Sequence, residues 1–343
     1  MKSTFARFTL MLASVAIVAA CAAAPATPAQ KVDAGKKDWP TQFTLGLFGG
    51  DDAEAALEGN KPVAEYIQKK TGVPVKFFTG TSYGAVIEAM RAKRIDAMTV
   101  GPFSYLLAVQ EAGAEALAIG VSTRKEPAIH DPSIRPSYFS VISVKKSGSI
   151  LKLADLKGKN FNYVDPASTS GHLVPKTLLL KNGIDPDKDM RTVFAGSHAT
   201  SIVALWNGKS DAAASTESTL YNLAQNKQIE FCGFPDGEVG KDRSKAEIDG
   251  LFEQCPNGKI AMLAYSEPIP NTPFAIRSDM PKSFKDAVRD ALLSMKDDAE
   301  FVKVSKRWYL DPHKEAKLPS LDAYYNPLRD IAKALDLDLK KLD

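Results

Sequence analysis

The feature that most constrains the fold of this chain is the alternation, from Phe43 onward, of short apolar runs with amphipathic helical patterns. In a first series, apolar runs at 43–49, 73–78 and 95–101 alternate with helical patterns at 54–70, 85–93 and 104–113. This order is typical of a mostly parallel sheet covered by helices, and it predicts an α/β lobe.

The same alternation resumes after an extended segment at 137–146. Strands are predicted at 160–165, 191–196 and 210–215, and helices at 171–182, 199–207 and 218–225. A second extended segment at 259–277 is followed by helical patterns at 282–296, 298–308 and 320–335, which can pack on the first lobe. Two series joined by two extended crossings predict two α/β lobes that close as a hinged clamp. We place lobe 1 at 41–136 and 274–343, and lobe 2 with the crossover strands at 137–273.

The first twenty residues resemble a targeting segment rather than part of the fold. Lys2 and Arg7 form a positive region, Phe8 to Val18 an apolar run, and small residues precede Cys21. This arrangement predicts a lipoprotein signal peptide at 1–20, with Cys21 as the lipid acceptor. The alternative, a permanent membrane helix, is disfavoured because the run is too short to span a bilayer. The Ala- and Pro-rich residues 21–40 are interpreted as a flexible tether, so we expect a periplasmic, membrane-anchored lipoprotein.

Export also bears on the two remaining cysteines, Cys232 and Cys255. In an oxidising compartment we predict that they pair across a polar loop, which would stabilise the fold by about 3 kcal/mol. The alternative is that they remain two free buried thiols.

Charge and motif content exclude several classes of function. Loss of Lys2 and Arg7 with the signal peptide lowers the formal charge from +3 to +1. A nearly neutral chain lacks the excess of positive charge that is typical of nucleic-acid-binding proteins. The chain has no HExxH, CxxC or Walker A motif and no GxGxxG after a strand, so we predict no cofactor and no metal.

The stretch "GTSYG", residues 80–84, fits the G-x-S-x-G pattern of a hydrolase nucleophile elbow with Ser82 as the nucleophile. His198 with Asp211 or Glu217 could complete the triad, but a hydrolase has its histidine in a loop near the C-terminus, where the only histidine is His313. The same stretch resembles residues 196–212, because each begins with Gly and hydroxyl residues and runs into a helical pattern. We therefore favour a helix-start loop that faces a cleft, and keep a secreted serine hydrolase as the alternative. A purely structural or adhesive lipoprotein would explain neither the loops nor the crossings.

The most informative stretch for binding is "DPASTSGH", residues 165–172. Ser168, Thr169 and Ser170 precede a helical pattern, where unpaired backbone N–H groups and the helix dipole favour an anion. One of these hydroxyls can simply cap the helix, but three in a row favour a binding loop.

Two further residues of this half have alternative roles. His198 can donate to an oxyanion from its helix-start loop or serve as a structural histidine. Glu217 can face water at a helix start, accept a proton from a protonated oxyanion, or pair with a ligand ammonium.

These stretches, with residues 45–108 and "AGSHATSIVALWNGKSDAA", resemble the phosphate-, phosphite- and phosphonate-binding proteins of bacterial ABC importers over residues 42–310. The resemblance implies the type II periplasmic-binding-protein fold and a solute-binding lipoprotein, not an enzyme. Such a protein captures a small phosphorus oxyanion and delivers it to membrane permease subunits, and we expect a monomer. The resemblance also implies a ligand-binding set of Tyr83, Tyr138, Ser168, Thr169, Ser170, His198 and Glu217, the last as the partner of an ammonium group. Tyr105 is a second-tier candidate.

The chain departs from this family at three places. The return segment has "PIPNTP" where "PNDP" is expected in many relatives, so Thr272 stands in place of a second acid. Ser82 stands where an aspartate is common, and both residues are second-tier candidates. The loop at 232–258 with its two cysteines is an elaboration.

Overall fold

A computed structural model describes residues 36–50, 52–122, 136–147 and 149–335. The predicted signal peptide, Cys21 and most of the predicted tether lie outside the described residues. Within the described ranges, no helix combines the length and the apolarity that a membrane crossing requires.

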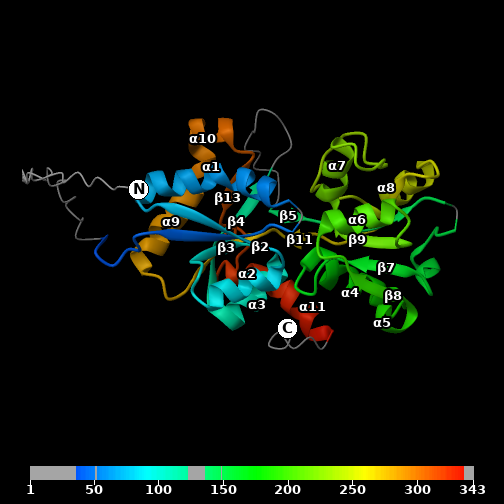
Figure 1. Ribbon diagram of the computed structural model, residues 1–343, viewed down its shortest axis with the longest axis horizontal. Coiled ribbons are helices and arrows are strands. Elements are labelled where there is room, and N and C mark those ends of the chain that lie inside the picture. Colours follow the sequence, from blue (N-terminus) through cyan, green and yellow to red (C-terminus); the bar gives the residue numbers. More distant parts are fainter. Residues whose placement is uncertain (1–35, 51, 123–135, 148, 336–343) are drawn as a thin grey trace, which may run out of the picture. The chain divides into compact units, whose positions relative to one another are not determined.

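The first of two main sheets has the strand order β13-β4-β12-β3-β1-β2 (Figure 1). Its strands are β1 (Phe43–Phe48), β2 (Val75–Gly80), β3 (Ala97–Thr99), β4 (Ala114–Ser122), β12 (Pro273–Arg277) and β13 (Arg307–Leu310). β1 pairs in parallel with β2 and β3, as the alternation predicts, whereas β12 and β13 return antiparallel to their neighbours. The carboxyl ends of the parallel strands therefore share one edge, where helix-start loops gather.

Helices cover both faces of this sheet because its side chains alternate between the two sides. In β12, Phe274 and Ile276 pack in one core and Ala275 in the other. One core contains residues of α1 (Ala53–Thr71), α9 (Lys282–Ser294) and α10 (Ala299–Val304); the other contains residues of α2 (Tyr83–Arg91), α3 (Pro102–Ala112) and α11 (Asn326–Ala334). We call this sheet with its helices the first lobe (Figure 1).

The second sheet has the order β10-β6-β9-β7-β8 and forms the second lobe with its helices. Its strands are β6 (Ser140–Lys145), β7 (Asn160–Tyr163), β8 (Arg191–Phe194), β9 (Ala212–Thr216) and β10 (Ile260–Tyr265). Its helices are α4 (Val174–Lys181), α5 (Pro186–Asp189), α6 (His198–Trp206), α7 (Glu217–Gln225) and α8 (Lys245–Gln254). β7 lies parallel to β8 and β9, so the helix-start loops of this lobe also share one edge.

Two extended segments connect the lobes. β5 (Ser137–Tyr138) precedes β6 and β11 (Ile269–Pro270) follows β10, and these two short strands pair antiparallel. Short helical turns at Leu153–Leu156, Thr169–Leu173, Met295–Asp297 and Asp322–Tyr325 complete the described elements. The two predicted crossings are present.

Three local predictions were wrong or incomplete. The helical pattern at 298–308 ends at Val304, and Arg307–Leu310 forms edge strand β13, because its backbone pairs with β4. β4 itself was not predicted. Part of the expected polar loop at 232–258 is helix α8, whose start has a capping box between Ser244 and Glu247. A disulfide joins Cys232 to Cys255.

Candidate functional site

A cavity of about 1140 Å³ is lined by segments from both lobes and from the crossings. Of the residues singled out in the sequence, it brings together Tyr83, Tyr138, Ser168, Thr169, Ser170, His198, Glu217 and Thr272. Figure 1 shows these residues' elements, α2, β5, α6 and α7, around the place where the lobes face each other. We call this cavity the cleft.

The Ser168–Ser170 turn enters the cleft as the start of one wide helical turn, Thr169–Leu173, ahead of α4. All three residues are buried, with exposed fractions of 1 to 2%. Gly171 permits the tight return, because a Cβ at this position would lie 2.3 Å from the Val164 side chain. Wide turns of this kind are frequent at functional sites.

The three hydroxyls have different local partners. Ser168 Oγ accepts the Gly171 N–H at 3.0 Å and thus supplies the helix cap that a single hydroxyl can provide. Thr169 Oγ1 accepts the Phe103 N–H at 2.8 Å, at the start of α3 in the first lobe. Thr169 and Ser170 also interact with the Tyr138 hydroxyl, although burial is the stronger influence and raises the pKa of Tyr138 to about 12. Tyr138 is therefore a neutral hydrogen-bond donor near neutral pH.

His198 and Tyr83 meet across the cleft. His198 is the first residue of α6, and Gly196 precedes it with a φ of +86°, a conformation that glycine adopts without strain. The Nε2 atom of His198 lies 3.4 Å from the Tyr83 hydroxyl. The Tyr83 ring stacks on Phe48 with ring centroids 4.1 Å apart, which fixes its direction.

Glu217 is 1% exposed and begins α7, where the helix dipole favours a carboxylate. Its Oε2 atom accepts the Gly240 N–H at 2.9 Å and the Tyr265 hydroxyl at 2.8 Å. Burial, together with the negative charge of Glu217, raises the pKa of Tyr265 far above its ordinary value. The Tyr265 hydroxyl is therefore a permanent donor to this carboxylate.

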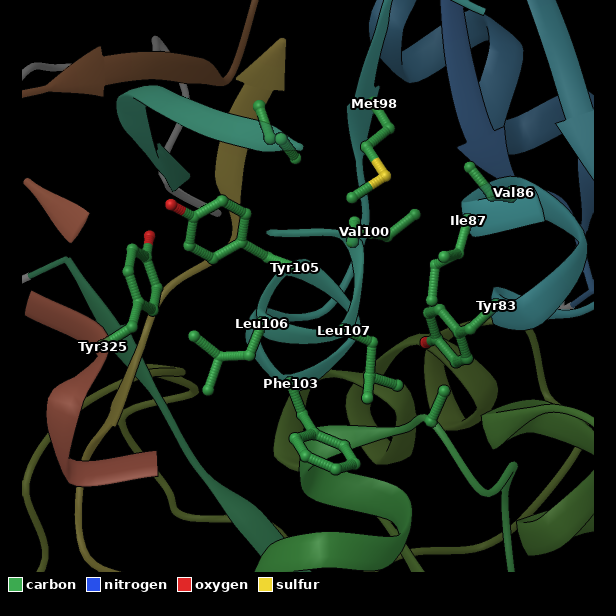
Figure 2. Close-up of a cluster of buried hydrophobic side chains, with 14 of the residues drawn as sticks. Tyr83, Val86, Ile87, Met98, Val100, Phe103, Tyr105, Leu106, Leu107 and Tyr325 are labelled. Atoms are coloured by element: carbon green, nitrogen blue, oxygen red, sulfur yellow. The ribbon is translucent and has the colours of Figure 1, made fainter. Parts of the chain in front are cut away.

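Two second-tier candidates lie elsewhere. Tyr105 is completely buried, its hydroxyl donates to Asp322 at 2.7 Å, and its ring lies 5.0 Å from that of Tyr325. Figure 2 shows this pair on the opposite side of α3 from Tyr83. Ser82 caps α2 by accepting the Ala85 N–H at 3.1 Å and does not line the cleft. Because α3 is buried along Pro102–Ala108, Tyr105 packs in the hydrophobic core, and it does not line the cleft.

Two charged parts of the cleft lining were not predicted from the sequence. The first is the segment Asp236–Asp242, for which the nearby cysteines were the only signal. The second is Arg307 of β13, whose Nη1 donates to the buried Asn60 Oδ1 at 2.7 Å. A guanidinium thus reaches the cleft although the binding loops themselves contain no Arg or Lys. The residues that the structure describes include no group of three His, Cys, Asp or Glu side chains placed to hold a metal ion.

The loop that precedes the Ser168–Ser170 turn also contacts the first lobe directly. The Asp165 carboxylate accepts the backbone N–H of Ala167 at 2.8 Å, and the backbone of Tyr83 at the start of α2 also favours its charged form. Ser104 Oγ donates to the Ala167 carbonyl at 2.7 Å. Burial raises the pKa of Asp165 above its ordinary value, and these backbone donors oppose the shift.

The arrangement as a whole can hold a small anion by neutral dipoles. Hydroxyls and two helix starts of the second lobe face tyrosines of the first lobe and the crossing. Fixed dipoles in a buried site can replace the water around a charge without reorganising.

The family comparison covers most of the chain. Residues 46–320 match the family described as ABC transporter, phosphonate, periplasmic substrate-binding protein.

Two curated relatives match parts of the chain. The phosphate-import protein PhnD of Mycolicibacterium smegmatis is 30% identical over 210 residues, which cover 58% of this chain and 63% of that protein. The phosphonates-binding periplasmic protein of Escherichia coli is 35% identical over 167 residues, which cover 47% of this chain and 46% of that protein. The chain therefore matches less than two thirds of the length of either relative.

Two solved structures share the fold. A binding protein component of an ABC phosphonate transporter from Pseudomonas aeruginosa has a TM-score of 0.61 and 24% identity, covering 88% of this chain and 96% of that chain. PhnD1 from Prochlorococcus marinus, solved in complex with methylphosphonate, has a TM-score of 0.62 and 16% identity, covering 87% and 99%. The predicted type II periplasmic-binding-protein fold is thereby confirmed.

Proposed function

The chain belongs to the family of periplasmic substrate-binding proteins of phosphonate ABC transporters, and we propose that it captures a small phosphorus oxyanion in the cleft. The candidate ligands are a phosphonate, phosphite or phosphate. We propose further that the loaded protein delivers this ligand to the permease subunits of its importer.

The observation that carries the proposal is the convergence of neutral donors from both lobes on one cavity. The Ser168–Ser170 hydroxyls and His198 come from the second lobe, Tyr83 comes from the first lobe, and Tyr138 comes from the crossing. Three hydroxyl-bearing residues and a helix start can surround the oxygens of a tetrahedral group. The phosphate-import relative and the methylphosphonate complex support the same class of ligand.

We propose ligand-driven closure as the mechanism. The anion docks on the helix starts of the second lobe, and Tyr83 and Tyr138 then close over it. Micromolar or tighter binding would correspond to a free energy of about −8 kcal/mol or better. The closed form is the one that the permease recognises.

The membrane anchor, the monomeric state and the bounds of the lobes are also proposals. Lipid on Cys21 would anchor the protein to a membrane in the periplasm, and the chain would act as a monomer. The lobes would comprise residues 41–136 with 274–343, and 137–273. We also propose that the protein is not an enzyme; in support, the Ser82 hydroxyl serves as a helix cap.

A ligand panel tests the proposed function. Calorimetry or thermal shift with phosphate, phosphite, hypophosphite, methylphosphonate, 2-aminoethylphosphonate and sulfate is expected to show binding of at least one phosphorus oxyanion and weaker binding of sulfate. Failure of every phosphorus oxyanion to bind would reject the proposal. Ester hydrolysis that is abolished by Ser82→Ala would favour the hydrolase instead.

A further inference from the structure

The segment Asp236–Asp242 contributes seven consecutive residues to the lining of the cleft. The same cavity contains the Ser168–Ser170 hydroxyls and His198. Its volume of about 1140 Å³ exceeds the range of about 300–1,000 Å³ that is usual for small-molecule sites. The cleft therefore has room for more than a bare tetrahedral oxyanion.

The middle of this segment is held by Glu217. The carboxylate accepts the Gly240 N–H and the Tyr265 hydroxyl on one oxygen atom, at 2.9 and 2.8 Å. The Tyr265 hydroxyl also lies 3.3 Å from the Lys241 carbonyl oxygen. Since Glu217 is buried at the start of α7 and Tyr265 ends β10, the segment is tied to two regular elements of the second lobe.

The flanks of the segment are held as well. The Arg243 side chain is 4% exposed, donates to the Asp236 carboxylate at 2.7 Å, and lies 4.0 Å above the Phe234 ring. The Phe234 N–H donates to the Tyr221 hydroxyl at 2.8 Å. The disulfide between Cys232 and Cys255 closes the larger loop that contains the segment.

We propose that Asp236–Asp242 is a fixed wall of the cleft that receives the substituent on phosphorus, and that Glu217 and Tyr265 are positioning residues that hold this wall. The inference rests on the proposed function and specifies it: the wall distinguishes phosphonates with an organic substituent from the bare inorganic oxyanion. The wall is polar because it contains Asp236, Glu238, Lys241 and Asp242.

This role differs from the ammonium-binding role that the family resemblance implies for Glu217. The charge of Glu217 is already stabilised by the Gly240 N–H and the Tyr265 hydroxyl, so its burial does not require a cationic ligand. A wall acts on any substituent, whereas an ammonium partner acts only on a cationic one. Ethylphosphonate and 2-aminoethylphosphonate have the same carbon chain and differ in the ammonium group, so comparing their affinities separates the wall role from the ammonium role.

The first test is Tyr265→Phe, measured by calorimetry with ethylphosphonate, 2-aminoethylphosphonate and inorganic phosphate. This change removes a donor to Glu217 and keeps the carboxylate charge. We expect both phosphonates to bind about tenfold more weakly, because a hydrogen bond to a charged group is lost, and phosphate to bind within about twofold of the wild type.

The matched control is Tyr163→Phe in β7 of the same lobe. Among the described residues, the Tyr163 hydroxyl has no hydrogen-bond partner, and the residue does not line the cleft. We expect this control to leave all three affinities unchanged.

The second test is Glu217→Gln, which keeps the side-chain shape and removes the charge. The expected result is that the ratio of the dissociation constants of the two phosphonates stays at its wild-type value. A loss of affinity that is confined to 2-aminoethylphosphonate would overturn the wall and establish Glu217 as the partner of the ligand's ammonium group. The wall would also be overturned if Tyr265→Phe lowered the affinities for phosphate and both phosphonates equally. An unchanged affinity of Tyr265→Phe for both phosphonates would overturn it too. If Tyr265→Phe fails to fold, as judged by its melting curve, the ratio in Glu217→Gln decides.

The wild-type protein separates failure of this inference from failure of the proposed function. A wild type that binds none of the three ligands, nor any other phosphorus oxyanion of the panel, rejects the proposed function and the wall with it. A wild type that binds phosphate but neither phosphonate overturns the wall alone.

Discussion

The direction of the His198 side chain is set by the backbone conformation at the start of α6. As the first residue of α6 it places its ring in the cleft, while Ser197 caps the helix by accepting the Thr200 N–H at 3.1 Å. The cap and the adjacent positive φ of Gly196 fix the direction of the imidazole toward Tyr83. A single residue such as His198 can therefore act as a directed donor in the cleft.

The first prediction at this scale concerns His198→Ala. We expect the dissociation constant of the preferred phosphorus oxyanion to rise by more than tenfold, because a hydrogen bond to an anion is lost in a buried site. Calorimetry measures the change. The control is His313→Ala, which removes a histidine that is paired with Asp311 outside the cleft and should leave the affinity unchanged. Equal affinities of His198→Ala and the wild type would remove His198 from the site.

The second residue-scale prediction concerns His172. Burial lowers the pKa of His172, and its bond to the Pro166 carbonyl only partly opposes this shift. Because the folded-state pKa lies below the unfolded value, the unfolded chain takes up the proton first as the pH falls. Stability is therefore lost below about pH 6.5, at no more than about 1.4 kcal/mol per pH unit for this one proton.

His172→Asn tests this sign, since the amide can still donate to Pro166 but does not titrate. The free energy of unfolding, measured by denaturant titration at several pH values, should fall less steeply between pH 7 and 5 in the variant. Identical slopes for the variant and the wild type would contradict the prediction.

At the scale of elements, the starts of α2 and α3 in the first lobe find partners in the 165–169 loop of the second lobe. Thr169 accepts the Phe103 N–H, and the Tyr83 backbone favours the charged form of the Asp165 carboxylate. A capping group normally comes from the residue next to the helix, as Ser82 does for α2, but the group that caps α3 comes from a residue 66 positions away. Contact between the lobes is thus part of how α3 satisfies its first backbone donors.

The third prediction follows from this contact. Asp165→Ala should weaken ligand binding by about fivefold although Asp165 does not line the cleft, because the closed arrangement loses the interaction of this carboxylate with the Tyr83 backbone. Asp165→Asn keeps an acceptor oxygen and should therefore lose less ligand affinity than Asp165→Ala. Calorimetry measures the affinity, and small-angle scattering with and without ligand measures closure. Asp155→Ala is the matched control, since Asp155 accepts backbone N–H groups only within the second lobe. A loss in the control as large as that in Asp165→Ala would refute the link between lobes.

Elements also show where sequence patterns were sufficient. Long segments such as 54–70 were predicted closely, because α1 has a strong helical repeat, an Asp52 cap and a left-handed Gly72 at its end. β13 was missed because four residues carry too little periodicity and its pairing with β4 depends on a partner almost two hundred positions away. The start of α8 did carry a readable signal, the Ser244 and Glu247 capping box.

At the scale of the whole molecule, the disulfide ties a loop that forms part of the cleft lining. The two cysteines are separated by 23 positions. Closing a loop of this length removes conformational freedom from the unfolded chain and stabilises the fold by about 3 kcal/mol. The bond therefore supports both the second lobe and the wall Asp236–Asp242.

The fourth prediction is that Cys232→Ser together with Cys255→Ser lowers the melting temperature by several degrees, in line with a loss of about 3 kcal/mol. Calorimetric melting measures this change. Adding a reductant to the wild type should reproduce it, and adding the same reductant to the double variant should have no effect. An unchanged melting temperature in the double variant would contradict the contribution of the bond.

The sequence by itself determined the two α/β series, the two crossings, the family resemblance and the hydroxyl-rich turn at Ser168–Ser170. These features follow from local periodicity and from short stretches whose residue types suit one purpose, so they can be seen without coordinates. The tertiary structure decided which residues face the cleft. Tyr83 and His198 meet across 115 positions, Arg307 arrives on an edge strand, Tyr105 turns into the core, and Glu217 takes Gly240 and Tyr265 as partners. The reason is physical: a helix or strand is specified by neighbours a few positions apart, whereas a cavity is specified by side chains that only folding brings together.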